Sequence, residues 1–346
     1  MNIHLVSGGC GFVGRNMVKR LLKTTNDAIF VVDDLSIGRH PKEWLENFTS
    51  RTYKDVEIIG EEERIYFWKG DFRDFLFNQR KNPRIIQETY NLDFGHFSDV
   101  YHFAAIVGGR MKIDGDPMMV GLDLSIDSEF FYWITRHKPN RVLYPSSSAA
   151  YPTSLQNAEG ALALKEGDID FNKNLGTPDM TYGWTKLTGE FLAQIAAKYY
   201  GISIVCIRPF SGYGEDQETS YPVPAIALRA AKKENPFEVW GSGKQGRDFV
   251  HIDDILDFIA ILMDRVNDGS AYNIGSGKLT SFLELIDVFT SFAGYHPTIK
   301  PLLDKPVGVQ SRYGDPTLVK EKFGWTPKIS LEEGMHRVYD AALKKL

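Results

Sequence analysis

Cysteine is almost absent from this sequence, which contains only Cys10 and Cys206, far apart in the chain. A disulfide framework is therefore not expected, and with no recognisable signal peptide a reducing cytoplasm is the expected compartment. The eight histidines are scattered, and neither a CxxC nor an HExxH pattern occurs. The sequence therefore predicts no metal site.

Long apolar runs and an excess of basic residues are also missing. No run approaches the roughly 18 apolar residues that a membrane span needs. The net charge of -5 provides no polycation for nucleic acid and no basic tail for an anionic membrane. We therefore expect neither nucleic acid nor a membrane as a partner. The remaining composition, 43% apolar and 25% charged, is typical of a globular protein with a sizeable core.

Short apolar runs alternate with amphipathic stretches through the first two hundred residues. The expected strands are residues 3–7, 28–33, 64–70, 99–105, 141–147 and 202–209, and the clearest helices are 12–23, 118–137 and 182–200. Continuous apolar strands separated by helices are typical of a parallel sheet that is covered on both faces. The sequence therefore predicts an α/β fold with a Rossmann-type doubly wound parallel sheet.

After Arg208 the sequence becomes richer in glycine and proline, and its helices become shorter. This change predicts a smaller C-terminal α/β domain that binds substrate. Two earlier segments interrupt the alternation. Residues 36–63 are polar and charged, residues 152–180 have few periodic features, and we expect each to be a surface loop or a lid.

Four glycines crowd between the first strand and the first helix, at Gly8, Gly9, Gly11 and Gly14. Their spacing fits G-x-G-x-x-G, in which the backbone approaches a pyrophosphate at a helix N-terminus. Asp33 ends the second strand, where a carboxylate accepts hydrogen bonds from a ribose and repels a 2′-phosphate, which favours NAD over NADP. The alternative is an ordinary glycine-rich turn beside an acidic strand end.

Tyr182 and Lys186 lie four residues apart in an expected helix, so their side chains share one face. A free tyrosine, with a pKa of about 10, is a poor base near neutral pH. A neighbouring ammonium and an oxidised nicotinamide both favour the phenolate, which can accept a proton from a sugar hydroxyl as hydride leaves. Ser147, at the end of a strand, can hydrogen-bond the same oxygen. The alternative is a packed tyrosine ring beside a solvated lysine.

Motifs along almost the whole chain resemble one enzyme family. They are "SGGCGFVG", "VVDDLSIG", "GDFRD", "YHFAA", "YPSSSAAYP", "YGWTK", "RPFSGYG", "GRDFVHIDD", "YNIGSG" and "DPTLVKEKFGWTP". In this order they resemble the extended short-chain dehydrogenases/reductases of the nucleotide-sugar epimerase and dehydratase group. Within the group, "AAIVGG", "LKEGD" and "FEVWGSGKQGRDF" are most similar to GDP-mannose 3,5-epimerases.

The resemblance implies a catalytic trio, a set of NAD contacts and a set of substrate contacts. The trio is Ser147, Tyr182 and Lys186. The implied NAD contacts are Gly8, Gly11, Phe12, Val13, Gly14, Asp33, Asp34, Asp71, Phe72, Ala104, Ala105, Tyr182, Lys186 and Pro209. The implied contacts of the nucleotide-sugar substrate are Gly108, Gly109, Ser147, Ser148, Arg247 and Arg312.

The resemblance also implies how the chain is divided and assembled. It predicts an NAD-binding domain of residues 1–208 plus about 249–275, a nucleotide-sugar-binding domain of residues 209–248 plus 276–346, and a homodimer. Arg247 and Arg312 match arginines that hold the nucleotide diphosphate, a role that suits a forked guanidinium. The alternative for either arginine is a structural ion pair. His251 and Cys10 are expected to be packing residues.

The two residues after Ser147 limit the reactions that we expect this chain to catalyse. A 4,6-dehydratase of this family has Asp-Glu there, and a 3,5-epimerase has a cysteine at the second position, whereas this chain has Ser148 and Ala149. Hydride transfer at one carbon, C4, therefore remains, as in a GDP-sugar 4-epimerase or 4-dehydrogenase. The alternatives are a dehydratase or 3,5-epimerase with unusual acid/base residues, and a non-catalytic NAD(H) sensor. Asp123 also replaces an asparagine that is frequent in relatives.

Overall fold

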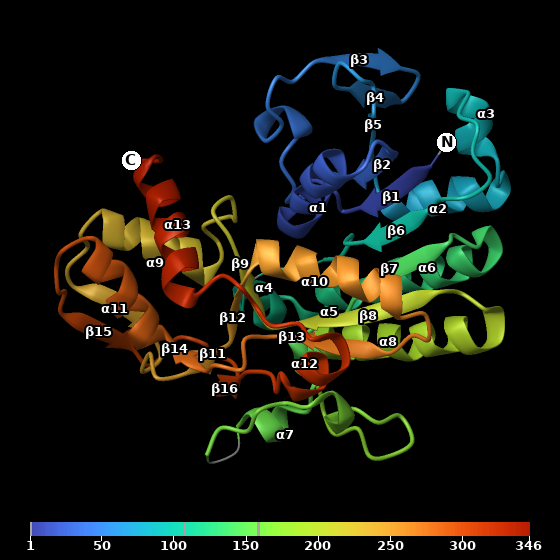
Figure 1. Cartoon of the computed structure of the whole chain (residues 1–346). Coiled ribbons are helices and arrows are strands. Elements are labelled where there is room, and N and C mark those ends of the chain that lie inside the picture. The colour runs from blue at the N-terminus through green and yellow to red at the C-terminus, as the bar shows by residue number, and fades with distance from the viewer. Residues whose placement is uncertain (1, 107, 109, 158–159) are drawn as a thin grey trace.

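A computed structural model describes residues 2–106, 108, 110–157 and 160–346. Its largest sheet has the strand order β13-β8-β7-β6-β1-β2-β5-β4-β3 (Figure 1). The seven strands from β13 to β5 pair in parallel. Their bounds are β1 Ile3–Ser7, β2 Ala28–Asp33, β5 Ile65–Lys69, β6 Asp99–His102, β7 Arg141–Pro145, β8 Ile204–Pro209 and β13 Ala271–Ile274. The Rossmann-type sheet predicted from the sequence is confirmed.

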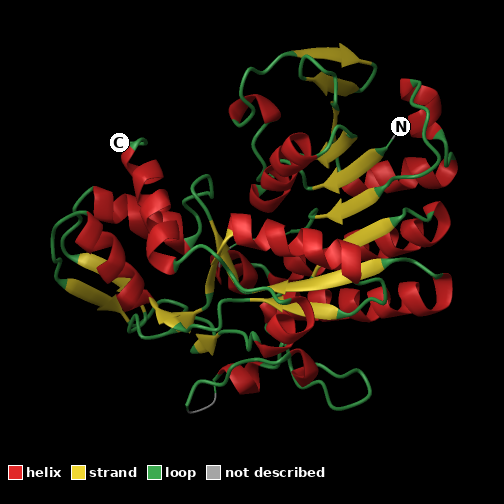
Figure 2. Cartoon of the chain, viewed as in Figure 1, coloured by secondary structure: helices red, strands yellow, loops and turns green. Residues whose placement is uncertain are grey.

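Helices cover both faces of this sheet because successive strand residues point to opposite sides. On β2, Ile29 and Val31 belong to one core, and Phe30 and Val32 belong to the other. The first core is covered by α1 (Phe12–Thr24), α10 (Ile252–Arg265) and α12 (Thr317–Phe323). The second is covered by α2 (Phe72–Lys81), α3 (Ile85–Tyr90), α6 (Asp123–His137) and α8 (Met180–Tyr200). Figure 2 shows these two layers of helices on either side of the strands.

The prediction that residues 36–63 form a loop or a lid is wrong. This segment contains β3 (Ser50–Tyr53) and β4 (Val56–Ile59), which form an antiparallel hairpin, and β4 pairs with β5. The segment looks polar because every side chain of β3 is exposed, whereas β4 buries Val56, Ile58 and Ile59. The long helix expected over 118–137 is also divided, into α5 (Pro117–Gly121) and α6, with α4 (Arg110–Gly115) before them.

The second part of the chain builds a separate core. It packs α9 (Pro222–Ala231), α11 (Phe282–Phe292) and α13 (Leu331–Leu343) with the strand pair β10 (Phe237–Trp240) and β15 (Ile299–Leu302). These elements lie together at the left of Figure 1. Two smaller groups connect them to the large sheet: β9 (Ser211–Tyr213) with β12 (Phe249–His251), and β11 (Gly246–Arg247) with β14 (Thr280–Ser281) and β16 (Ser311–Arg312). The exact domain division stays a prediction.

Residues 152–180 contain α7 (Thr153–Gln156) and the short 3₁₀ helix η3 (Glu166–Asp168), and are otherwise irregular up to the start of α8 where the structure describes them. They are attached to the sheet at several points. The side-chain amide of Asn273 donates through its Nδ2 to the Leu164 carbonyl at 2.8 Å. The backbone N–H of Asn273 donates to the Glu166 carboxylate at 3.0 Å. The expected irregular segment is therefore present, but it is bound to the end of β13. Throughout the described ranges, no helix combines the length and apolar character that crossing a bilayer requires.

A buried ion pair joins this segment to the core. Arg208 on β8 binds both carboxylate oxygens of Glu190 on α8, at 2.8 and 2.6 Å, and donates to the Tyr151 hydroxyl at 2.9 Å and the Glu166 carbonyl at 3.0 Å. Ser146 also donates to Glu190. Removing one partner of such a pair leaves an uncompensated charge in the interior, which costs more than the pair itself contributes.

Glu190→Gln is therefore expected to lower the free energy of unfolding by about 3–5 kcal/mol, because the Arg208 guanidinium stays buried without its anion. Urea unfolding monitored by circular dichroism measures this loss. The matched control is Glu129→Gln, which removes the partner of Arg80 in a pair with exposed side chains and should cost less than about 1 kcal/mol. Equal losses in the two variants would contradict the interpretation.

Candidate active site

In the glycine loop between β1 and α1, the glycine positions 8 and 14 are packed so tightly that neither has room for a Cβ. Gly8 has a φ of +64°, and a Cβ there would lie 2.6 Å from the Ala104 nitrogen and the Phe103 carbonyl at the end of β6. A Cβ on Gly14 would lie 2.1 Å from the Gly8 carbonyl oxygen. These contacts bring the first turn of α1 against the end of β1. The loop therefore presents backbone N–H groups at a helix N-terminus, the arrangement that binds a pyrophosphate.

Asp33 lies at the end of β2, beside this loop. Its carboxylate accepts hydrogen bonds from the backbone N–H groups of Cys10 at 2.9 Å and Leu35 at 2.8 Å. Burial raises the pKa of the Asp33 carboxyl, although these backbone donors act in the opposite direction. Cys10 is completely buried, and burial raises the pKa of its thiol well above the ordinary value. Cys10 is thus a packing residue of the loop, as predicted.

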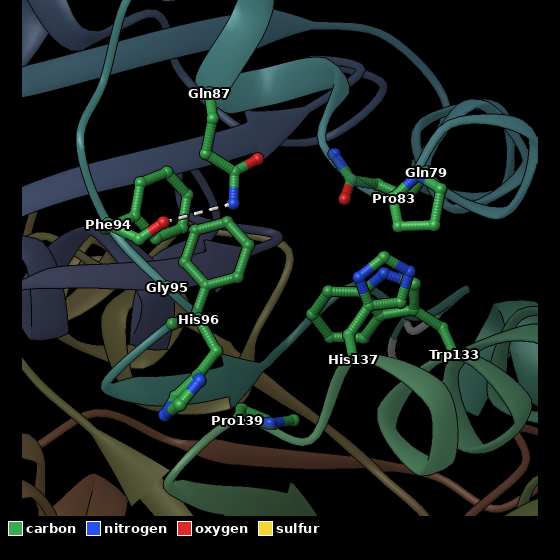
Figure 3. Close-up of a pocket in the computed structure, with 10 residues that line it drawn as sticks. Gln79, Pro83, Gln87, Phe94, Gly95, His96, Trp133, His137 and Pro139 are labelled. Carbon is green, nitrogen blue, oxygen red and sulfur yellow. Dashed lines mark hydrogen bonds between the residues drawn. The ribbon is translucent and has the colours of Figure 1, made fainter.

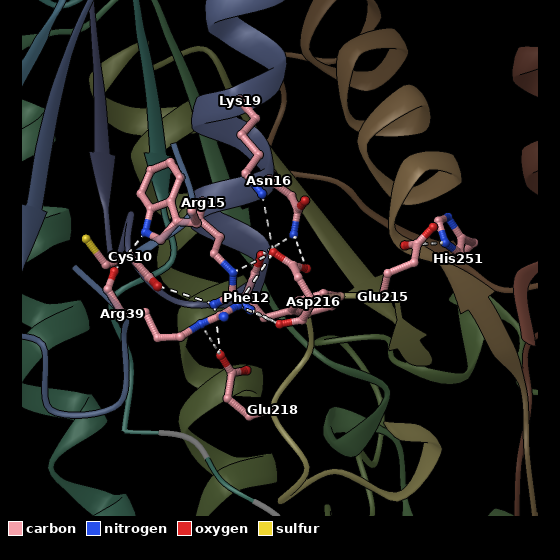
Figure 4. A network of polar contacts seen from close by, with 11 residues as sticks. Cys10, Phe12, Arg15, Asn16, Lys19, Arg39, Glu215, Asp216, Glu218 and His251 are labelled. Carbon is pink, nitrogen blue, oxygen red and sulfur yellow. Dashed lines mark hydrogen bonds and ion pairs between the residues drawn. The ribbon is translucent and has the colours of Figure 1, made fainter. Parts of the chain in front are cut away.

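A charged network that the sequence reasoning missed joins α1 to the loop after β9 (Figure 4). Arg15 is completely buried, and it lies 2.7 Å from Asp216 and 2.9 Å from Glu218. Arg39 donates to the Asp216 carbonyl at 2.7 Å and lies 3.6 Å from Glu218. The signal in the sequence is an arginine directly after Gly14, in the first turn of α1, where the structure buries it.

Tyr182 and Lys186 lie on α8, as the spacing predicted. The Lys186 ammonium is buried and lies 5.8 Å from the centre of the Tyr182 ring. Burial acts to lower the pKa of Lys186, but the carboxylates of Asp127 and Asp123 and the Tyr182 phenol outweigh it, and the pKa is raised. Lys186 therefore remains a cation beside the phenol over the physiological range of pH.

Ser147 follows β7 and begins a short turn that faces the start of α8. Its hydroxyl oxygen accepts a hydrogen bond from the Ala149 N–H at 3.1 Å. The Ala149 carbonyl in turn accepts from the Asp179 N–H at 3.0 Å. A Cβ on Gly183 would lie 2.4 Å from that carbonyl oxygen, so α8 can approach the turn only because residue 183 is glycine. The structure thereby brings Ser147 to the end of α8 that carries Tyr182.

Apart from Tyr182 and Lys186 on α8, the predicted NAD contacts lie at one edge of the sheet, where parallel strands end. They stand at or shortly after the ends of β1, β2, β5, β6 and β8. In an open α/β sheet this edge forms the crevice that binds ligands. Asp71 caps the N-terminus of α2 and pairs with Arg73, which lowers the pKa of its carboxyl. The Phe72 ring is buried in the second core, which α2, α3, α6 and α8 cover. The roles of these residues in NAD binding stay predictions.

The predicted substrate residues are partly engaged with the protein itself. Arg312 binds Gln156 and lies 2.7 Å from Asp179. Arg247 donates to the carbonyls of Val309 at 3.0 Å and Val307 at 3.2 Å. Both guanidiniums are thus held between segments, and their contact with a diphosphate stays a prediction. Gly108 lies in the connection between β6 and α4, and the predicted residue Gly109 lies outside the described residues.

The two residues after Ser147 carry no acid or base in the structure, as the sequence indicated. Ser148 and Ala149 are buried within the turn, and neither side chain is an acid or a base. Asp123 is buried at the start of α6, where its carboxylate accepts the Ile106 N–H. His251 is a structural residue as expected: it caps α10, and its other ring nitrogen lies 3.1 Å from Glu215.

Figure 3 shows a pocket at the opposite edge of the sheet, where β6 and β7 begin. Its cavity volume is only about 20 Å³, and it is lined by aromatic, amide and histidine side chains, among them Gln79, Trp133 and His137. Trp133 and His137 stack with ring centres 5.0 Å apart. Because the predicted catalytic residues lie where strands end, this pocket is separate from the candidate site.

Comparisons with known proteins agree with this geometry. The putative GDP-L-fucose synthase 2 of Arabidopsis thaliana is 28% identical over 252 residues, which cover 70% of this chain and 75% of that protein. GDP-mannose 3,5-epimerase 1 of Oryza sativa subsp. indica is 29% identical over 250 residues, covering 69% and 63%. The crystal structure of the Thermotoga maritima UDP-glucose 4-epimerase with UDP-glucose superimposes with a TM-score of 0.79 at 23% identity, covering 100% and 99%.

The strand order and the glycine loop therefore define an enzyme of the extended short-chain dehydrogenase/reductase type. The profile of the NAD dependent epimerase/dehydratase family matches residues 4–275, and the chain belongs to this family. Its cofactor is NAD. The resemblance recognised in the sequence is confirmed.

Gly14→Ala tests the glycine loop. The added methyl would lie 2.1 Å from the Gly8 carbonyl oxygen, so the loop must shift at a cost of about 1–3 kcal/mol. This strain falls on the loop that is predicted to bind NAD, so we expect affinity for NAD to decrease by about 10- to 100-fold, which isothermal titration calorimetry measures. Gly121→Ala in α5, where nothing lies within 4 Å of the new Cβ, should bind as the wild type does. Unchanged affinity in Gly14→Ala would contradict the assigned role.

Proposed function

We propose that this enzyme oxidises the sugar of a nucleotide sugar at C4 by hydride transfer to NAD, as a 4-epimerase or 4-dehydrogenase. The observation that supports this best is the placement of Tyr182 and Lys186 on one face of α8, whose first turn packs against the turn that begins at Ser147. The two residues that follow Ser147 provide no acid or base for elimination or for epimerisation at C3 and C5. Chemistry at a single carbon therefore fits the residues that are present.

The residues act together on one hydroxyl group. Tyr182 takes the proton from the 4-hydroxyl, while the C4 hydrogen leaves as hydride and C4 becomes a ketone. Lys186 stabilises the phenolate by its charge, and Ser147 orients the same oxygen by a hydrogen bond. NAD, when bound, accepts the hydride. A 4-epimerase returns the hydride to the other face of the ketone, whereas a 4-dehydrogenase releases the oxidised sugar.

The proposed substrate is a GDP-linked sugar. Two relatives of similar identity have names that refer to GDP sugars, and the motif resemblance points in the same direction. Arg247 and Arg312 are the proposed contacts of the diphosphate. We further propose a reducing cytoplasm as the site of action, because both cysteines are free and buried, and a division into the two domains predicted from the sequence.

Tyr182→Phe tests the mechanism. It removes the proton acceptor, and we expect the rate of hydride transfer to fall by about 10²- to 10⁴-fold while NAD still binds. The measurement is NADH absorbance after mixing the NAD-loaded enzyme with GDP- and UDP-hexoses. Tyr199→Phe, on the exposed end of the same helix, is the matched control. Full activity in Tyr182→Phe would remove this residue from the mechanism.

The position of oxidation is read from the product of the same reaction. If the enzyme is a 4-dehydrogenase, borodeuteride reduction of the released ketone should place deuterium at C4, which mass spectrometry and NMR detect; if it is a 4-epimerase, NMR should identify the C4 epimer of the substrate. A 4-keto-6-deoxy product would instead identify a dehydratase. Wild-type protein that binds NAD but forms neither NADH nor product with any nucleotide sugar would favour the non-catalytic sensor.

The proposed assembly is a homodimer through α6 and α8. These helices pack side by side, and they expose large apolar side chains, including Leu124, Trp184 and Phe191. Exposed apolar faces of this kind mark interaction sites.

Leu124→Arg should therefore weaken the dimer, because it introduces a charge into the apolar face. Multi-angle light scattering across a dilution series should show the mass falling toward 39.2 kDa at concentrations where the wild type is dimeric. Leu343→Arg, at a similarly exposed position of α13, is the control and should keep the wild-type mass. A dimer of equal strength in Leu124→Arg would exclude this face.

A further inference from the structure

A buried polar cluster lies beside the Tyr-Lys pair, between α6 and the centre of the sheet. Asp127 on α6 accepts a hydrogen bond from the Tyr144 hydroxyl at 2.6 Å with one oxygen. Its other oxygen lies 3.1 Å from His102 Nε2. His102 Nδ1 lies 2.8 Å from the Ser7 hydroxyl. All four side chains are buried, so both oxygens of the Asp127 carboxylate are fixed by partners from two different strands.

Lys186 approaches the same cluster from α8. Its ammonium lies 5.5 Å from the centre of the Tyr144 ring. One turn later, Gly189 lies so close that a Cβ there would come 1.9 Å from the Tyr144 hydroxyl oxygen. Tyr144 is therefore packed against α8 while its hydroxyl is bonded to Asp127 on α6. The ammonium of Lys186 and the carboxylate of Asp127 thus flank one aromatic ring.

Among the described residues, the ionisable groups around Lys186 come from four elements. They are Asp127 and Asp123 on α6, Tyr182 on α8, His102 on β6 and Tyr144 on β7. Burial lowers the pKa of His102, so the ring adds no second cation to Asp127 and Lys186. The pKa of Asp127 is lowered in spite of burial, by His102, Lys186 and Tyr144, and that of Tyr144 is raised. Asp127 is therefore an anion that packs with Lys186 around the Tyr144 side chain, and Asp123 adds a second negative charge.

We propose that Asp127 is a positioning residue of this enzyme, which holds Lys186 as an ammonium beneath Tyr182. This inference rests on the proposed function, because it assigns the anion that the Tyr-Lys pair requires. An ammonium in the interior is stable only when a fixed opposite charge compensates for its lost hydration. Asp127 provides that charge without contacting the reacting atoms.

The consequence concerns alkaline pH. With Asp127 in place, Lys186 keeps its proton and continues to favour the phenolate. Burial lowers the pKa of Lys186, and the Asp127 charge opposes this effect. Without that charge the pKa of Lys186 is lower, and its proton is lost at lower pH. Asp127→Asn should therefore retain more activity near neutral pH than at alkaline pH, and the alkaline limb of its kcat profile should move down by about one pH unit or more.

The decisive measurement follows Lys186 itself and requires no turnover. The protein is labelled with ¹³C at the lysine ε carbons, and the Lys186 signal is assigned by its loss in Lys186→Arg. In Asp127→Asn this signal should titrate at lower pH than in the wild type, by about one unit or more. Asp127→Glu, which keeps the charge, should restore most of the wild-type titration. If Asp127→Asn does not fold, Asp127→Thr, which is also uncharged and of similar size, takes its place.

Asp99→Asn is the matched control. Asp99 is also a buried carboxylate beside a histidine, 3.2 Å from His4, but it lies at the beginning of β6 and binds Arg141 at 2.6 Å. Its substitution should lower stability and leave the Lys186 titration unchanged. An identical Lys186 titration in Asp127→Asn and the wild type would overturn the inference. Lack of turnover by the wild type would overturn the proposed function instead, and it would not alter the titration result.

Discussion

The approach of α1 to the end of β1 is the constraint on which the rest of the structure depends. The Gly8 carbonyl oxygen packs so closely against Gly14 that no Cβ fits there, and Gly8 itself packs against the backbone that follows β6. This contact sets the direction of α1 and leaves backbone N–H groups free at its N-terminus. It also belongs to the edge of the sheet at which the parallel strands β1, β2 and β6 end side by side. The residues proposed for cofactor binding after these strands therefore lie at one edge.

Among the described residues, three buried cations are compensated by carboxylates that come from distant parts of the chain. Arg15, Lys186 and Arg208 lie on different elements, and each is compensated by carboxylates from another part of the chain. Arg15 joins α1 to the loop after β9, and Arg208 joins the sheet to α8 and residues 152–180. Because an unpaired charge is costly in the interior, each pair also favours one arrangement of the segments that it connects.

Much of this could be predicted from the sequence, for identifiable reasons. The strands of the parallel sheet are continuous apolar runs, and the glycine spacing and the Tyr182–Lys186 spacing depend only on local geometry. The hairpin of β3 and β4 was missed because one of its strands is fully exposed and therefore polar. Asp127, His102 and Tyr144 could not be brought together from the sequence, since they come from three elements whose contact depends on the packing of α6 on the sheet. The same reason applies to Arg15 and Asp216, which are 201 residues apart.

The exposed hairpin strand has a consequence for how molecules of this protein meet. β3 is the outermost strand at its end of the sheet, it is only four residues long, and all of its side chains are exposed, Arg51 among them. A short, charged border strand is a poor template for a strand of another molecule. The sheet is thus discouraged from growing by strand addition at this border, and open-ended fibres are disfavoured there. Self-association is left to surfaces of other kinds, which can close into assemblies of defined size.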